Sequence, residues 1–241
     1  MLKTFLGSLL NIIFPKTCLV CHRPLKDNNI SDFLCLDCYR SIKKNAPPLC
    51  TICGRQIRGV HVYKNVCPAC QRQQFSFDRA LAPCVYEGVA RELIHKFKYQ
   101  NRDYLSQILG KIIIDFIRQY RITLIFFDLV MPVPLHKTRL REREFNQAEL
   151  LACQIAREFS LPVCASNLWR KEYRKPQAEL KEEKRRKNIK GCFSLRKPAE
   201  IKGKNIILVD DVLTTGATCS EAASVLKAAG ALSVWVLTLA N

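Results

Sequence analysis

"ILVDDVLTTGAT", from Ile207 to Thr218, places two carboxylates directly after a run of apolar residues. Near-continuous apolar runs are typical of parallel strands that are buried on both faces. Parallel α/β sheets bind their ligands at the carboxyl ends of strands. The sequence therefore predicts a buried strand at 206–209 that delivers Asp210 and Asp211 to the rim of such a sheet.

The stretch after the carboxylates is small, hydroxylated and centred on one glycine. Thr218 and Glu221 have the spacing of a capping box, which predicts that a helix begins there. A glycine-containing turn that leads into a helix offers free backbone N–H groups and a favourable dipole to an anion. The final Gly-Lys-Ser/Thr of a Walker A loop is missing. The predicted phosphate-binding residues are Thr214, Thr215, Gly216, Ala217 and Thr218.

Together the two halves of this stretch suit a sugar phosphate. The turn would hold the phosphate, and Asp210 and Asp211 would accept hydrogen bonds from the sugar hydroxyls or hold a magnesium ion. An acidic strand end followed by a polar turn explains either half alone, but it explains the combination poorly.

Apolar periodicity extends the prediction to the rest of the domain. Residues 79–87, 124–134 and 232–240 are predicted strands, and 104–120 and 146–159 are predicted helices. A further helix follows the opening stretch and ends at Ala229, before Gly230. Alternating strands and helices favour an α/β fold with a mainly parallel sheet.

Eight of the 13 cysteines form four C-x-x-C pairs in the first third of the chain. Adding 32 to each position of the first two pairs gives the second two pairs, so the segment is a tandem repeat. Two such turns can complete a tetrahedral zinc site, and loops this short need metal to fold. The predicted ligands are Cys18, Cys21, Cys35, Cys38, Cys50, Cys53, Cys67 and Cys70.

We expect structural Zn²⁺, two ions in all, in preference to disulfides or a redox pair. One zinc per repeat is the simplest pairing, and interleaved pairing is an alternative. His22 and His61 are expected at the surface. The remaining cysteines are expected to be small core residues: Cys84, Cys153, Cys164, Cys192 and Cys219.

The net charge of +18 favours a polyanionic partner such as nucleic acid, a phosphorylated metabolite or an acidic membrane surface. No run of about 18 uncharged apolar residues is present, so no membrane span is predicted. The start, "MLKTFLGSLLNIIFPKTC", imitates a signal peptide but lacks a cleavage site. A short amphipathic helix is the preferred interpretation, and the expected compartment is cytoplasmic.

"IILVDDVLTTGAT" resembles the signature of the type I phosphoribosyltransferases. "LIHKFKYQNR" (93–102), "PVPLHKTRLREREFNQAELLA" (132–152) and "RKPQAELKEEKRRKNIKGCF" (174–193) are similar to the ComF family, including GntX-like proteins. Members of that family also carry an N-terminal double zinc ribbon, so the resemblance covers nearly the whole chain. One departure is Glu144, where the family usually has glycine before Phe-Asn-Gln.

The resemblance implies a double zinc ribbon over 1–76 and a type I phosphoribosyltransferase-like domain over 77–241. It implies a phosphoribosyl pyrophosphate site with Mg²⁺, in which Asp210 and Asp211 are the catalytic pair. The loop after Pro134 offers cations for the pyrophosphate, and we favour Lys137 and Arg139.

The resemblance further implies a protein that helps incoming single-stranded DNA during natural transformation, with other DNA-uptake proteins such as a helicase as partners. Residues 170–190 could close over the site or follow a DNA backbone, with Trp169 or Tyr173 stacking on a base. A second basic cluster consists of His95, Lys96, Lys98 and Arg102. The alternative is a metabolic phosphoribosyltransferase that acts on a base or amine, with a purely structural zinc module. Enzyme activity is favoured, with the acceptor open.

Overall fold

The computed structural model describes residues 16–25, 30–57, 65–172 and 189–241. The amphipathic start, His61, Tyr173 and most of the basic segment 170–190 lie outside these residues. The helices are α2 (Leu36–Arg40), α3 (Pro68–Gln71), α4 (Gly88–Tyr99), α5 (Leu105–Gln119), α6 (Lys137–Arg143), α7 (Gln147–Phe159), η2 (Pro198–Ile201) and α9 (Ala217–Ala228). None of the helices in the described ranges could cross a bilayer, since they are too short and too polar.

Four strands form the central sheet in the order β1 (Arg79–Leu81), β6 (Ser233–Ala240), β5 (Asn205–Val212) and β2 (Leu129–Pro132). Every neighbouring pair in this sheet is parallel, which confirms the predicted fold class. A separate antiparallel pair joins β3 (Leu168–Arg170) and β4 (Phe193–Leu195). All carboxyl ends of the central strands therefore meet at one edge.

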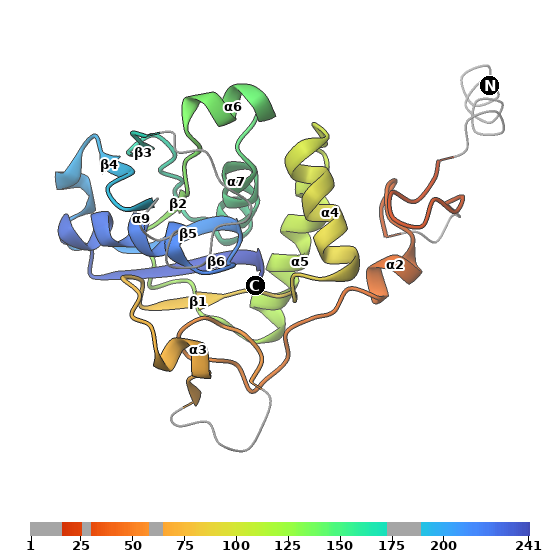
Figure 1. Cartoon of the computed structure of the whole chain (residues 1–241), viewed down its shortest axis with the longest axis horizontal. Helices are drawn as coiled ribbons and strands as arrows, with labels where there is room; N and C mark the ends of the chain where they lie inside the picture. The colour runs from red at the N-terminus through yellow and green to blue at the C-terminus, as the bar shows by residue number, and fades with distance from the viewer. Residues whose placement is uncertain (1–15, 26–29, 58–64, 173–188) are drawn as a thin grey trace.

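Alternate residues of β5 enter different apolar clusters, as the two-residue period of a strand requires. Ile207 and Val209 pack with α4, α5 and α7 on one face, whereas Ile206 and Leu208 pack with α9, β3 and β4 on the other. The sheet is therefore covered on both faces, which explains the continuous apolar run in its sequence (Figure 1).

The two cysteine repeats lie on opposite faces of this sheet. The first repeat belongs to the cluster of α4 and α5, where Phe33 packs on Tyr104 with ring centroids 4.2 Å apart. The second repeat belongs to the cluster of α9. In Figure 1, α3 of the second repeat lies beside β1, and α2 of the first lies well away from it, beyond α4 and α5.

Several element boundaries differ from the prediction. The strand expected over 79–87 ends at Leu81, because Pro83 has no N–H to donate to a ladder. The strand expected over 124–134 is confined to β2, and Ile125 and Phe126 before it are exposed. Helices α5 and α7 begin and end within one residue of the prediction, and Asn146 caps α7 by accepting from the N–H of Ala148.

Glu144 has a φ of 64°, in the left-handed region where glycine is at ease. It ends α6 and turns the chain toward Asn146. The turn therefore has the backbone conformation that a glycine would adopt, although a glutamate occupies it.

Candidate functional site: a carboxylate pair and phosphate loop beside two cysteine clusters

Each cysteine repeat gathers its own four thiols. Within each group the four sulfur atoms lie within 4.8 Å of one another, so the pairing follows the repeat and is not interleaved. The Cys21–Cys35 and Cys53–Cys67 Sγ–Sγ distances are both 3.7 Å. A tetrahedron with metal–sulfur bonds of about 2.3 Å has sulfur–sulfur edges of about 3.8 Å. The thiol geometry therefore fits a closed tetrahedral zinc site.

The pKa values of thiols in one cluster shift in opposite directions. Burial acts to raise the pKa of Cys18, but hydrogen bonds from backbone N–H groups lower it to about 6. Burial raises the pKa of the Cys38 thiol, and its close contacts with Cys35 and Cys21 raise that pKa further. Four thiolates this close would repel one another without a cation between them. All thirteen cysteines are free thiols in this structure, and His22 is exposed as predicted.

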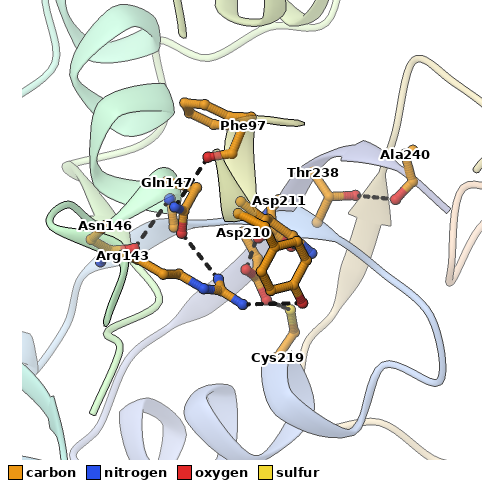
Figure 2. Close-up of polar contacts among 12 residues, drawn as sticks. Phe97, Arg143, Asn146, Gln147, Asp210, Asp211, Cys219, Thr238 and Ala240 are labelled. Atoms are coloured by element: carbon orange, nitrogen blue, oxygen red, sulfur yellow. Dashed lines mark hydrogen bonds and ion pairs between the residues drawn. The ribbon is translucent and has the colours of Figure 1, made fainter. Parts of the chain in front are cut away.

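Asp210 and Asp211 lie at the carboxyl end of β5, where the sequence predicted them. The N–H of Asp211 donates to Asp210 Oδ1 at 2.8 Å, and the thiol of Cys219 on α9 donates to Asp210 Oδ2 at 3.5 Å. Burial, and then the charge of Asp211, raises the pKa of Asp210 to about 7. Asp210 is therefore only about half ionised at neutral pH. Figure 2 shows Asp210, Asp211 and Cys219 gathered at this end of the strand.

Lys98 is a site residue that the sequence analysis assigned to a surface cluster. It extends from the end of α4, and its Nζ lies 2.7 Å from Asp211 Oδ1, with both side chains about 85% buried (16% and 14% exposed). Burial acts to lower the pKa of Lys98, but the charge of Asp211 and a hydrogen bond to it raise that pKa. Lys98 is therefore the counter-ion of the carboxylate pair.

The signal for Lys98 was present in the sequence. Apolar Ala90, Leu93, Ile94 and Phe97 recur at helical spacing and are all buried in α4. Recognising this helix would have placed Lys98 on its inner side, next to Phe97.

The predicted phosphate loop connects β5 to α9. Gly216 has a φ of +73° and is the N-cap of α9, which begins at Ala217. Within the described ranges, the backbone N–H groups of Thr214, Thr215 and Gly216 donate to no residue. Free N–H groups at the start of a twelve-residue helix suit a phosphate.

The predicted capping box is wrong. The N-cap of the helix is Gly216, two residues earlier than expected, and Thr218 is not the cap. Glu221 is engaged elsewhere, since its Oε1 accepts from the N–H of Gly191 at 2.6 Å.

Basic side chains of α6 and β3 lie near each other, and the one on β3 lies near Asp210. Arg170 is largely buried, and burial lowers its pKa while the charge of Asp210 raises it and that of Arg139 lowers it. Arg139 also pairs with Glu142, whereas Lys137 is exposed at the start of α6. The structure therefore brings the unpredicted Arg170 near Asp210, places Arg139 near Arg170, and leaves Lys137 at the surface.

Arg143 ties α6 to the end of α4. Its guanidinium lies over the ring of Tyr99, 4.9 Å from the centroid, and donates to Gln147 Oε1 at 3.1 Å. Gln147 in turn donates to the carbonyl of Phe97 (Figure 2). This network positions the loop after β2 against the helix that carries Lys98.

The predictions for the remaining cysteines are confirmed only in part. Cys84, Cys192 and Cys219 are buried as predicted, but Cys153 is exposed on α7 and the core prediction is wrong for it. Of the predicted stacking residues, Trp169 is 36% exposed on β3. His95 is exposed and packs against Tyr99, with ring centroids 4.9 Å apart.

Comparison with known proteins identifies both parts of the chain. The double zinc ribbon domain family matches residues 9–71, and the phosphoribosyl transferase domain family matches residues 146–241. The first match covers all eight clustered cysteines, and the second covers the carboxylate pair and its loop.

Three curated relatives align over most of the chain. Competence protein F of Haemophilus influenzae is 32% identical over 211 residues, covering 86% of this chain and 90% of that protein. Competence protein ComFC of Bacillus subtilis is 30% identical over 216 residues, covering 86% and 83%. DNA utilization protein YhgH of Escherichia coli is 28% identical over 227 residues, covering 92% and 96%. With its two tetrathiol ribbons and its carboxylate pair at the end of β5, the chain belongs to the competence protein F family.

Proposed function

We propose that the chain binds the magnesium complex of phosphoribosyl pyrophosphate and single-stranded DNA, and acts in the cytosol during DNA uptake. The observation that carries the ligand assignment is the juxtaposition of Asp210 and Asp211 with the free N–H groups of 214–216. The DNA assignment is supported by the net charge of +18 and by relatives named for competence and DNA utilization.

The proposed roles follow from the chemistry of each group. The loop Thr214–Thr218 binds the 5′-phosphate, and the carboxylates accept hydrogen bonds from the ribose hydroxyls. Arg139, Lys137 and Arg170 bind the pyrophosphate. When bound, magnesium supplies further positive charge to the pyrophosphate. Lys98 holds Asp211 in place through their ion pair.

Transfer is proposed as the reaction, with the acceptor open. The bond between C1 of the ribose and the pyrophosphate oxygen breaks, and C1 bonds to a nucleophile of the acceptor. Asp210 and Asp211 lie where they can stabilise positive charge that develops at C1. An acceptor on single-stranded DNA would join the two activities, and a free base or amine would make the chain a metabolic transferase.

Calorimetric titration with the magnesium complex of phosphoribosyl pyrophosphate tests the ligand assignment. The Asp210→Asn, Asp211→Asn double variant should bind about a hundredfold more weakly, because each lost charge-assisted hydrogen bond costs about tenfold. Asp115→Asn is the matched control, since Asp115 pairs with Lys111 on the surface of α5. Equal affinity in the parent chain and the double variant would refute the assignment.

Release of pyrophosphate then separates the two functions. Release that requires single-stranded DNA supports the DNA-handling role. Release that responds to free bases or amines and ignores DNA supports the metabolic role.

A further inference from the structure

The second zinc ribbon, defined as residues 50–77 so that it includes the segment after Cys70, contacts the phosphate loop directly. Arg55 lies just after the Cys50–Cys53 turn, and its Nη2 donates to the carbonyl of Thr214 at 2.7 Å. Gln73 lies just after α3, and its Nε2 donates to the carbonyl of Thr215 at 3.2 Å. Two consecutive loop carbonyls therefore point at the ribbon.

The same ribbon extends under the glycine of the loop. A β-carbon at Gly216 would lie 2.5 Å from Cε1 of Phe75, so the loop backbone rests directly on this ring. Phe75 is stacked on Phe77 with centroids 4.7 Å apart, and the N–H of Ser76 donates to Ser220 Oγ on α9 at 3.0 Å. The underside of the loop and the start of α9 are thus supported from residues 73–77.

The direction of these contacts bears on anion binding. In a trans peptide unit the C=O and the following N–H point in opposite directions. Holding the carbonyls of Thr214 and Thr215 against the ribbon therefore turns the N–H groups of Thr215 and Gly216 away from it, toward the open side of the loop. The ribbon orients the donors that a phosphate needs.

The duplication supplies an internal comparison. Arg23 occupies in the first ribbon the position that Arg55 occupies in the second, 32 residues later. The equivalence extends to the backbone, because Cys18 N–H donates to Arg23 O and Cys50 N–H donates to Arg55 O, at 2.9 and 2.8 Å. Arg23 is exposed, and its ribbon packs on the opposite face of the sheet.

We infer that the second ribbon is a working part of the phosphoribosyl site, in which Arg55 and Gln73 are positioning residues and zinc retention is coupled to phosphate binding. The inference rests on the proposed function. Coupling between two binding events is reciprocal, so a ligand on the loop stabilises zinc in the second ribbon as much as zinc stabilises the ligand. The zinc of the first ribbon lies outside this coupling.

Titration with ribose 5-phosphate measures the positioning role. Arg55→Ala should weaken binding about tenfold, the usual effect of losing one hydrogen bond from a charged donor. Arg55→Lys keeps a donor and a charge and should recover part of the affinity. Arg23→Ala, the matched control in the other repeat, should stay within about twofold of the parent chain.

Zinc release to a colorimetric chelator provides a readout that does not depend on activity. In the parent chain and in Arg23→Ala, ribose 5-phosphate should slow the release of one zinc of the two. In Arg55→Ala this protection should be lost, with both zinc ions present at the start. Gln73→Ala, which leaves the cysteine turns unchanged, replaces Arg55→Ala if that variant is purified without its second zinc.

The outcomes separate the two proposals. If the parent chain does not bind ribose 5-phosphate, the proposed function fails and the inference fails with it. If the parent chain binds, but the Arg55, Gln73 and Arg23 variants bind equally and ribose 5-phosphate protects neither zinc, the inference alone is overturned.

Discussion

Asp210 is a buried carboxylate beside a second carboxylate, Asp211. Its ionisation should therefore control ligand binding. The groups around it are Asp211 on the same strand, Lys98 from α4, Cys219 from α9 and Arg170 from β3. Because its pKa is about 7, Asp210 accepts hydrogen bonds fully only above that pH.

The affinity for ribose 5-phosphate should therefore be greatest above about pH 7.5 and fall by up to tenfold per unit as the pH drops through 7. Calorimetry between pH 5.5 and 8.5 measures this. Asp210→Asn should retain only the shallower dependence that comes from the phosphate itself, whose second pKa is about 6. A parent chain with the same profile as Asp210→Asn would contradict the assignment.

The raised pKa of Asp210 affects folding stability in the opposite direction, since stability falls as the pH rises. The unfolded chain loses this proton near pH 3.8, the ordinary pKa of an aspartate, and the folded chain loses it near pH 7. Asp210 therefore favours the folded state at acidic pH, and its contribution declines as the pH rises between these two values.

The sequence predicted the site residues that are consecutive in the chain. It missed those that other helices and strands bring to the site. Asp210, Asp211 and the loop are consecutive, so their adjacency is legible in the sequence. Lys98 and Arg170 reach the same edge from separate elements. Helical spacing indicates the inner side of α4 for Lys98, but the meeting of the two residues depends on the tertiary fold. The capping box failed because Gly216 could begin the helix at a φ that threonine avoids.

Helices α5 and α7 pack closely where Gly110 of α5 faces Gln154 of α7. A β-carbon at Gly110 would lie 2.9 Å from Cβ and 3.0 Å from Cγ of Gln154. These two helices cover one face of the sheet, and α7 also follows α6, which carries Arg143.

Gly110→Ala should destabilise the chain by about 1 kcal/mol. Alanine adds about 1 kcal/mol of helix propensity, but overpacking between the helices costs about 1–3 kcal/mol. Urea unfolding in zinc-saturated buffer measures the change. Gln107→Ala, at an exposed position of α5, should leave the midpoint unchanged or raise it slightly. A rise in stability for Gly110→Ala would contradict this expectation, because it would show that the interface between the helices accommodates a β-carbon.

The elements that the sequence predicted well are those with long, uninterrupted periodicity. Helix α5 and strand β5 repeat their apolar pattern over many residues, so their type was unambiguous. Strand β2 was predicted too long because exposed Ile125 and Phe126 extend its apolar run beyond the paired residues. Apolar character alone does not report whether a partner strand is present.

At the scale of the whole molecule, the excess of 18 positive charges predicts how DNA binding responds to salt. Each phosphate contacted on a single strand contributes a slope of about −0.7 to the logarithmic salt dependence. A site of about five phosphates would lose roughly a hundredfold in affinity between 50 and 200 mM salt. Fluorescence anisotropy with a labelled oligonucleotide measures this slope.

An oligomer with the same bases on an uncharged backbone is the control for that experiment. It should bind weakly at every salt concentration. Equal binding of the two oligomers, or a parent affinity that ignores salt, would reject the electrostatic assignment.

The domain boundary at residue 76 stays a prediction. Composition alone cannot test it, because the ribbons and the larger domain pack into the same apolar clusters. The cysteine pattern ends there, so the sequence favours two separate parts. The structure joins each ribbon to the apolar cluster on one face of the sheet. Asn241 bridges the parts as well, since its side chain accepts from Asn45 and donates to the carbonyl of Cys53.

Contacts between the second ribbon and the end of the chain also constrain the order of events during synthesis. Arg55 and Thr214 are 159 positions apart, and Cys53 and Asn241 are 188 apart. Strand β1 has β6 as its neighbour in the central sheet, so β1 cannot pair until β6 has been synthesised. At roughly 5–20 residues per second the ribosome needs roughly 10 to 40 seconds to supply these partners. The nascent ribbon must hold its zinc and keep its thiols reduced before the surface that it packs against has been made.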